Sequence, residues 1–185
     1  GWVCEHGPMP ETDADRTPPS PAGWLLVADQ SVLDIDPMIE AVGQVYRYPV
    51  ADAERAAALA AGQPCFLLRT DRSKVIGLWA VGEVVGDAAP LADDGTDDGA
   101  EPRWAAEVEL LPLEKAIARA KLIEHTVLAD SPVATATFAD TPVPLDRRTV
   151  RALETFDFWL VDPRPDQRDA LDALLDADES AGGPD

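Results

Sequence analysis

Two apolar stretches with a short polar segment between them form the strongest pattern in the chain. They are residues Pro64–Thr70 and Val75–Val85, joined by the polar tetrad Asp71–Lys74. Two strand-like stretches at this spacing predict a β-hairpin. Glycines interrupt the second stretch, among them Gly77 and Gly82, and glycine inside a strand marks a bulge, a barrel corner or a close approach of two backbones. We therefore expect a long central strand with a kink at one of these two glycines, which favours a small, twisted β-barrel.

A short apolar stretch at residues 158–161 predicts a closing strand. A family resemblance, given below on its own motif, implies three more strands, at residues 23–27, 46–50 and 103–111. In the second of them Tyr46 and Tyr48 share one face and Arg47 lies on the other, because successive side chains of a strand point to opposite faces. Strands of this length, separated by turns and short helices, predict a β-rich domain.

Four segments carry the signals of helices: residues 36–42, 52–61, 146–156 and 166–178. Each of the first three begins at an aspartate (Asp36, Asp52 or Asp146), whose carboxylate can cap a helix by accepting a backbone N–H. Pro37 suits the first helical position, and Gly62 ends the second helix. In the third, Val150, Leu153 and Phe156 form the apolar face. In the fourth, Leu171, Leu174 and Leu175 lie on one stripe, so this helix is expected to dock on the domain or to fray.

The net charge of −20 is concentrated in three segments. Residues 1–22 carry 4 acidic and 1 basic side chains, residues 87–102 carry 6 and 0, and residues 162–185 carry 8 and 2. These segments sum to −15, which leaves −5 for the rest. We expect residues 1–22 to be a mobile arm and Asp87–Pro102 to be a loop that projects into solvent.

The choice of charged residues modifies how this acidity is interpreted. Aspartate outnumbers glutamate 23 to 12, and the chain has only three lysines, Lys74, Lys115 and Lys121. Such surfaces resemble those of cytosolic proteins from salt-accumulating halophiles; the alternative is an ordinary protein with acidic tails. In molar salt the screening length falls to about 3 Å, so net charge becomes weak evidence against nucleic-acid binding.

The sequence contains no convincing catalytic or metal-binding constellation. Cys65 lies in an apolar stretch, where a buried hydrophobic residue is more common than a nucleophile. Glu107 and Glu109 share a strand face, and such a pair is usually a solvated surface. Cys4 and His6 supply two ligand types, whereas structural zinc needs four. We therefore expect no catalytic residue, metal or cofactor, and an enzyme is the minority interpretation.

The hairpin also resembles the central hairpin of the EVE family, a branch of the PUA-like barrels. The matching motif is G-[IL]-x-A-x-G-E-V, present as Gly77–Val84 after a glycine turn, an apolar strand and a polar turn. Looser matches are Trp24 in the first strand and the pattern P-L-x-x-x-I-x-R-A-x-L at Pro112–Leu122. The family usually has Gly-Asp where this chain has Gly62-Gln63.

The resemblance implies an α+β fold, a mixed and mostly antiparallel PUA-like β-barrel with short peripheral helices. The domain would span residues 23–163, between an acidic arm at 1–22 and an acidic tail at 164–185. The implied function is a non-enzymatic nucleic-acid-binding module that reads a modified base in RNA or DNA. In such folds an aromatic-walled pocket holds a flipped base, and stacking contributes about 1–3 kcal/mol per base.

The expected contacts fall into three groups. The pocket residues are Trp79, Tyr46 and Tyr48, with Arg47 at the rim and Trp104 as a further ligand contact. Trp24 and Trp159 are expected in the core, and Trp79 is either a pocket or a core residue. Basic groups for phosphate contact are Lys115, Arg119, Lys121, Arg147, Arg148 and Arg151.

Other functions stay open on the sequence alone. The same fold can bind a small molecule or nucleotide, act as a protein-interaction module through its acidic tails, or host an enzyme that acts on nucleic acid. No apolar run reaches the length of a membrane span and no signal peptide is visible, so we expect a cytoplasmic protein without a membrane partner.

Overall fold

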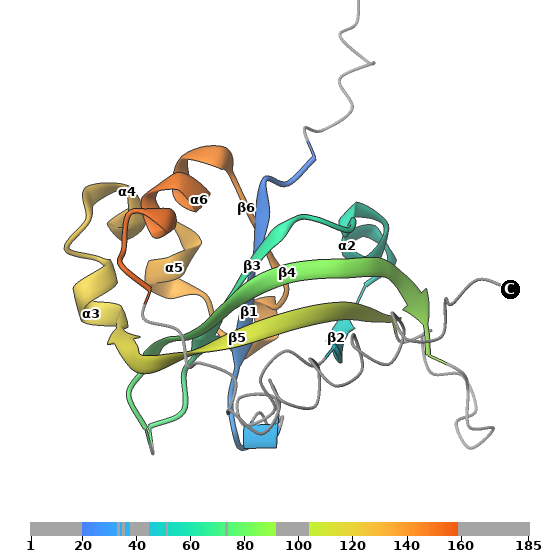
Figure 1. Cartoon of the computed structure of the whole chain (residues 1–185), viewed down its shortest axis with the longest axis horizontal. Coiled ribbons are helices and arrows are strands. Elements are labelled where there is room, and N and C mark those ends of the chain that lie inside the picture. Colours follow the sequence, from blue (N-terminus) through green and yellow to red (C-terminus); the bar gives the residue numbers. More distant parts are fainter. Residues whose placement is uncertain are drawn as a thin grey trace, which may run out of the picture.

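The structure is a computed structural model. It describes residues 20–32, 34, 36–37, 45–50, 52–72, 74–91 and 104–158. These residues form one mixed sheet of six strands flanked by short helices (Figure 1). Within this part of the chain, no helix has the length and apolar character needed to cross a membrane.

The six strands are arranged in the order β2-β5-β4-β3-β1-β6. Only β1 and β3 pair in parallel; the other neighbours are antiparallel. The strands are β1 (Gly23–Ala28), β2 (Val45–Val50), β3 (Pro64–Arg69), β4 (Gly77–Pro90), β5 (Trp104–Ala118) and β6 (Val143–Leu145). The α+β class and the mostly antiparallel sheet are therefore confirmed.

The predicted hairpin is confirmed as β3 and β4, with Cys65 opposite Gly82 and Arg69 opposite Gly77. The glycines mark close approaches to β5, because a Cβ at Gly77 would overlap the carbonyl oxygen of Ile117, and one at Gly82 that of Glu109. The register slips between these two glycines, at Trp79, rather than at either of them. The backbone irregularity thus moves a tryptophan out of the regular alternation.

The sheet is open rather than a closed barrel among the described residues. Strands β2 and β6 are its edges. It curves enough, however, for the hydroxyl of Tyr48 on β2 to donate to the carbonyl oxygen of Val27 on β1, over 2.8 Å. The expected barrel is therefore replaced by a curved sheet whose two sides approach each other across a core.

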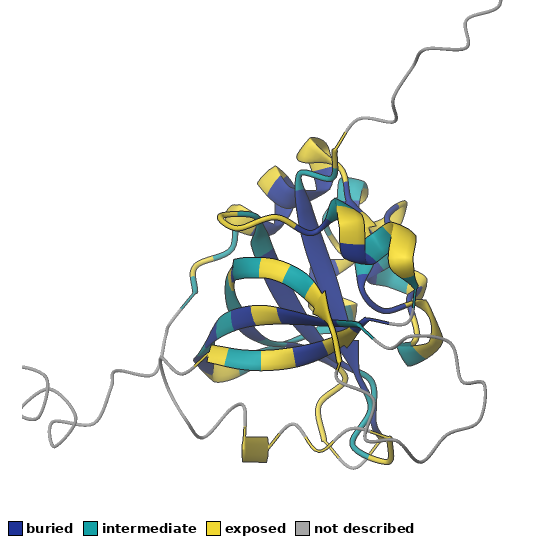
Figure 2. Cartoon of the chain, turned by 90° about the vertical axis from the view of Figure 1, so that its right-hand side faces the viewer, coloured by how far each residue is buried: buried dark blue, intermediate teal, exposed yellow. Residues whose placement is uncertain are grey.

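Both faces of the sheet are covered. The inner face holds Trp24, Leu26, Tyr48, Leu67 and Val108, closed by α2 (Ala53–Ala58). The outer face packs against the remaining helices: α3 (Arg119–Leu122), α4 (Thr126–Ala129), α5 (Pro132–Thr135), the 3₁₀ helix η1 (Phe138–Asp140) and α6 (Arg147–Glu154). Figure 2 shows the consequence: β1 and β3 are buried along nearly their whole length, whereas the long strands β4 and β5 change between buried, half-buried and exposed positions.

Two predicted helices are confirmed with their caps. Asp52 accepts a hydrogen bond from Arg55 N at 2.7 Å to begin α2, and Asp146 accepts from Thr149 N at 2.7 Å to begin α6. The helix α2 ends at Ala58 with Leu59 as its C-cap, so the stop predicted at Gly62 lies three residues too late. Gly62 is in the turn that follows, with a φ of 85°, a conformation that favours glycine. Of the predicted helix at 36–42, only Asp36 and Pro37 are described, and both are helical.

Three further boundaries were predicted wrongly. The segment from Asp87 was expected to be loop, but β4 continues to Pro90, which pairs with Trp104. The strand expected to end at Leu111 continues through Pro112 to Ala118. Phe158 is not in a strand, and the rest of the predicted closing strand lies outside the described residues, as do Trp159, residues 1–19 and the predicted helix at 166–178.

Candidate functional site

Tyr48 is a core residue in the structure. Its side chain is fully buried, and its hydroxyl is shared between Val27 O at 2.8 Å and Thr141 Oγ1 at 2.7 Å. Burial raises the pKa of Tyr48. The strand alternation placed Tyr46 and Tyr48 correctly on one face, but Tyr48 lies too deep in the fold to meet a base.

Tyr46 lies nearer the surface, on the same inner face. It is half-buried at the edge of the inner core, and its hydroxyl donates to Pro37 O at 2.7 Å. Through this contact Tyr46 is connected to the segment Asp36–Pro37. The same segment contacts Arg69 on β3, so it links two of the strands that form the inner face.

Trp79 is half-buried at the register slip of β4. Its neighbours Leu78 and Ala80 pair with Ile117 and Pro112 of β5, so residues 113–116 bulge opposite the tryptophan. The indole Nε1 donates to Val75 O at 2.7 Å, a contact at the surface. Trp79 is therefore partly accessible to solvent, unlike Trp24, which is buried in the inner core as predicted.

One side of the Trp79 ring is covered by the guanidinium of Arg69, whose Cζ lies 5.0 Å from the ring centre. A guanidinium at this distance is attracted by the negative face of the indole. The Arg69 side chain is only 2% exposed, so its charge needs partners. It acts as a rigid support that holds the indole in one orientation.

Three polar side chains hold Arg69 in place. Nε donates to Asp71 Oδ1 at 2.5 Å, Nη1 to Asp36 Oδ1 at 3.1 Å and Nη2 to Gln30 Oε1 at 3.3 Å. Burial disfavours the charged form, but the hydrogen bonds and charges of Asp71 and Asp36 outweigh it, so the pKa of Arg69 is raised. The guanidinium of Arg69, which stays charged and has a hydrogen-bond partner on each of its three nitrogens, therefore lies against the Trp79 ring.

The sequence analysis did not identify this network. Arg69 was not singled out there and lies inside the apolar stretch Pro64–Thr70. A signal was present, because Arg69 and Asp71 stand two residues apart and so project to the same side of an extended chain. The contributions of Gln30 and Asp36 depend on the parallel pairing of β1 with β3, which no local pattern encodes.

The other two predicted ligand residues lie away from Trp79. Trp104 pairs with Pro90, eleven residues further along β4 than Trp79, and its half-buried ring packs against the inner core. Arg47 is exposed on β2, opposite Glu107 of β5. The structure therefore does not gather Trp79, Tyr48 and Trp104 into one pocket.

Exposed basic and apolar side chains surround the Trp79 end of the hairpin. The β3–β4 turn carries Arg72 and Lys74, followed by Val75 and Ile76, which are 48% and 38% exposed. The carbonyl of Ile76 accepts a hydrogen bond from Arg119 N at 2.8 Å, which fixes the turn beside the junction of β5 and α3. We call Arg72, Lys74, Val75, Ile76, Trp79 and Lys115 the hairpin-end surface.

Lys115 projects from the part of β5 that bulges opposite Trp79. Together with Lys121 it lines a cavity of about 550 Å³, whose other walls include Leu113, Ile117 and Asp157. Lys121 also forms an exposed ion pair with Glu124 at 2.5 Å. Of the predicted basic group, these two lysines are therefore brought together.

Arg119, the third member of that group, is engaged within the fold. Its Nη2 donates to Ala136 O at 2.7 Å, and burial lowers the pKa of its guanidinium. Its Nε is buried without a hydrogen-bond partner among the described residues. Arg119 connects α3 to the end of α5 rather than facing solvent as a phosphate ligand would.

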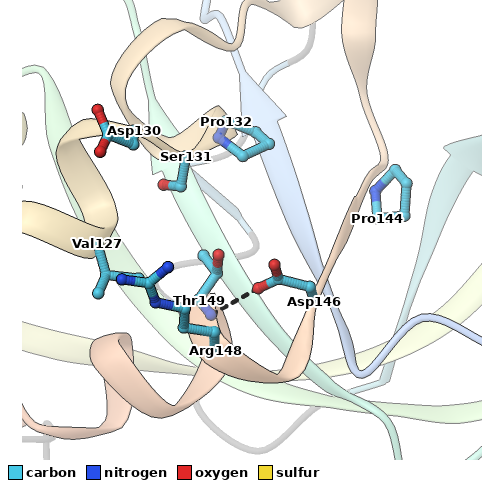
Figure 3. Close-up of a pocket in the computed structure, with 8 residues that line it drawn as sticks. All are labelled: Val127, Asp130, Ser131, Pro132, Pro144, Asp146, Arg148 and Thr149. Carbon is cyan, nitrogen blue, oxygen red and sulfur yellow. Dashed lines mark hydrogen bonds between the residues drawn. The ribbon is translucent and has the colours of Figure 1, made fainter.

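The three arginines of α6 are exposed, as predicted. Arg148 borders a cavity of about 240 Å³ between α6 and the α4–α5 turn, together with Asp130, Ser131 and Asp146 (Figure 3). Two carboxylates on its wall make this cavity a poor anion site. The arginines of α6 lie on a helix that packs on the outer face of the sheet, whereas Arg69 follows Cys65 and Leu67 of the inner face at every second position along β3.

Cys65 is buried in the inner core, and burial raises the pKa of its thiol to about 12. A thiol of this kind is protonated at neutral pH and is a weak nucleophile. This agrees with the prediction that Cys65 acts as a small hydrophobic residue.

Comparison with known proteins shows the fold alone. No family model and no curated relative matches the chain. A hypothetical protein from Leishmania major is similar in structure (TM-score 0.56, 15% identity, 72% of this chain and 92% of that chain). So is a protein from Pseudomonas putida (TM-score 0.55, 16% identity, 72% and 97%). The DUF55 domain of human thymocyte nuclear protein 1 is similar at a TM-score of 0.49 and 17% identity, over 73% and 99%.

Proposed function

We propose that this chain is a non-enzymatic nucleic-acid-binding module of the PUA-like type, related to EVE proteins, in which Trp79 stacks on an unpaired base. The observation that carries the proposal is the half-exposed indole of Trp79 supported on one side by the buried guanidinium of Arg69. A preorganised aromatic surface loses little conformational freedom when a base stacks on it.

The charges around Trp79 favour the same function. Arg72, Lys74 and Lys115 are exposed at this end of the hairpin, and the nearby carboxylates of Asp71 and Asp36 are both engaged by Arg69. An aromatic side chain among exposed cations is the usual surface for single-stranded nucleic acid, because bases stack while cations contact phosphates. A modified base in RNA or DNA is the specific ligand that the EVE resemblance implies.

The overall acidity does not oppose this proposal strongly. The described residues carry 17 acidic and 11 basic side chains, a net charge of −6 out of −20 for the whole chain. Most of the negative charge therefore belongs to other segments. Local potential at the hairpin-end surface, rather than net charge, governs the contact with a phosphate chain, since fields are screened within about 8–10 Å at ordinary ionic strength.

Fluorescence anisotropy with short labelled single-stranded RNA and DNA tests the proposal. Trp79→Ala removes the stacking surface and should abolish base preference, whereas Trp79→Phe keeps a ring and should retain much of it. Lys74→Ala with Lys115→Ala should weaken all sequences alike and flatten the salt dependence. The pair Arg148→Ala and Arg151→Ala, on the outer face, should also leave base preference intact.

Thermal unfolding of the same variants separates binding from folding. A Trp79→Ala protein that melts far lower yet binds oligonucleotides with unchanged preference would make Trp79 a packing residue and overturn the proposal. If the wild-type protein bound a polyanion without bases as tightly as it binds every oligonucleotide, base stacking would not explain the binding and the proposal would likewise fail.

A further inference from the structure

The segment Asp36–Pro37 is tied to two strands that do not pair with each other. The hydroxyl of Tyr46 on β2 donates to the carbonyl oxygen of Pro37 at 2.7 Å. Nη1 of Arg69 on β3 donates to Asp36 Oδ1 at 3.1 Å. In the sheet, β5 and β4 lie between β2 and β3, so this segment is a direct connection that bypasses both of them.

Gln30 closes the connection with its side-chain amide. Its Oε1 accepts from Arg69 Nη2 at 3.3 Å, and its Nε2 donates to Asp34 Oδ1 at 2.7 Å and to Asp36 Oδ2 at 3.4 Å. An amide supplies an acceptor for a cation and donors for carboxylates at the same time, whereas a glutamate carboxylate supplies acceptors alone. Gln30 is therefore suited to join Arg69 to two aspartates.

These contacts determine the orientation of the Arg69 guanidinium. Asp71 binds Nε, the nitrogen nearest the aliphatic stem, and this contact alone leaves the outer two nitrogens free to swing. Gln30 and Asp36 bind the outer two nitrogens. Because the guanidinium is a rigid planar group, contacts at all three nitrogens fix its plane.

The guanidinium in turn restrains the indole of Trp79. A hydrogen bond of 2.7 Å from Nε1 to Val75 O holds one edge of the ring, and the guanidinium, 5.0 Å from the ring centre, limits its tilt. We propose that Gln30 and Tyr46 are positioning residues for base stacking on Trp79. They act through the segment Asp36–Pro37 and the guanidinium, so neither contacts the base. This inference rests on the proposed function, because it names the residues that orient the stacking surface.

Removal of one hydroxyl tests the proposal in the free protein. Tyr46→Phe keeps the ring and deletes only the donor to Pro37 O, an exposed contact. The matched control Tyr48→Phe deletes a hydroxyl that is bonded within the core. The indole Nε1–H signal of Trp79, recorded by NMR without nucleic acid, reports the orientation of the ring. We expect Tyr46→Phe to shift or broaden this signal with little change in melting temperature. Tyr48→Phe should lower the melting temperature and leave the signal in place.

The amide of Gln30 allows the same comparison. Gln30→Glu removes the donors to the two aspartates and adds a carboxylate beside them, so it should also move the Trp79 signal. Its matched control is Gln63→Glu, which removes the donors to Pro21 O and Ala58 O and should leave that signal in place.

Oligonucleotide binding connects the positioning to function. Tyr46→Phe leaves every charge in place, so it should weaken binding of the preferred sequence several-fold and leave the salt dependence unchanged. A residue that only supports the fold would lower the melting temperature without this selective loss.

Two results would overturn the positioning role. The Trp79 signal could stay in place in Tyr46→Phe, which would show that the hydroxyl does not affect the ring. The signal could also move equally in Tyr46→Phe and Tyr48→Phe, which would assign the change to a general loosening of the fold. Failure of the proposed function gives a different result, because the Trp79 signal of the wild-type protein would then not respond to a bound oligonucleotide.

Discussion

Replacing Arg69 with methionine should destabilise the fold strongly, because it removes the ion-pair partner Arg69 from the buried carboxylate of Asp71. The Asp71 side chain is 8% exposed and its Oδ1 lies 2.5 Å from Arg69 Nε. Breaking a buried ion pair by removing one member costs about 3–5 kcal/mol. The lost guanidinium–indole contact with Trp79 adds roughly 0.5–2 kcal/mol. Methionine keeps an apolar stem of similar length, so the loss is mainly electrostatic.

Two companion variants give this prediction its control. Asp36→Asn affects the other carboxylate on Arg69, but Asp36 is 51% exposed and its pair should contribute only about 0–1 kcal/mol. The double variant Arg69→Met, Asp71→Leu removes both buried charges and should recover part of the stability lost in the single variant. A buried ion pair is identified by the order of the three unfolding free energies, with Arg69→Met the least stable variant, and not by any single value.

Urea unfolding of the full-length variants at one fixed KCl concentration measures these differences, provided that the slope with urea is unchanged. The reasoning is refuted if Arg69→Met costs less than about 1 kcal/mol, or if it costs no more than Asp36→Asn. Either result would mean that water reaches Arg69 and that its support of Trp79 is weak.

Three further predictions concern the fold. Gly82→Ala should destabilise by about 1–3 kcal/mol because its Cβ meets the Glu109 carbonyl, whereas Gly86→Ala meets only the movable end of the Glu107 side chain and should cost less; urea unfolding compares them. Asp146→Ala should cost about 1 kcal/mol of stability and Asp146→Asn much less. Hydrogen bonds from Thr149 lower the pKa of Asp146, so its contribution to stability is present above the ordinary pKa of 3.8 and is lost as the pH falls below that value. Acid unfolding of the wild type and the Asn variant will show or refute this dependence. If the aspartate-rich composition is a halophilic adaptation, the melting temperature should rise strongly between low and molar KCl, and a melting temperature independent of KCl would contradict this.

The elements that the sequence predicts well have local causes. The β3–β4 hairpin follows from two apolar stretches around a polar turn, and α6 follows from the cap Asp146 and its buried residues Val150 and Leu153. In each, the determining residues lie close together along the chain, within one short helix or within two strands joined by one turn. Their partners in space add stability but do not change the type of element.

The elements that it predicts poorly depend on distant residues. Helices α3, α4 and α5 have four residues each, too few for a periodic pattern. Pro112 signals the end of a strand, yet β5 continues because the proline lies beside the register slip opposite Trp79, where ladder hydrogen bonds are already interrupted. Extension of β4 to Pro90 likewise requires pairing with β5.

The same limit applies to the candidate site. Alternation correctly gives Tyr46 and Tyr48 a common face, but depth in the fold depends on the curvature that takes Tyr48 to Val27. Simple alternation along the strand predicts that Trp79 points to the face opposite its neighbours Leu78 and Ala80. In the structure, a register slip at Trp79 interrupts this alternation. The contact of Arg69 with Trp79 joins the end of β3 to the register slip of β4, so only the fold reveals it.

The most direct test of base stacking is an indole N–H titration by NMR. The five tryptophans give separate Nε1–H signals, assigned by substitution, and a short single-stranded oligonucleotide is added to the full chain. The account predicts that the Trp79 signal shifts upfield with saturation. The Trp24 signal, whose indole is buried and donates to Gln63 Oε1 at 2.7 Å, should stay in place. A Trp79 signal that does not move while the oligonucleotide binds would contradict the central claim.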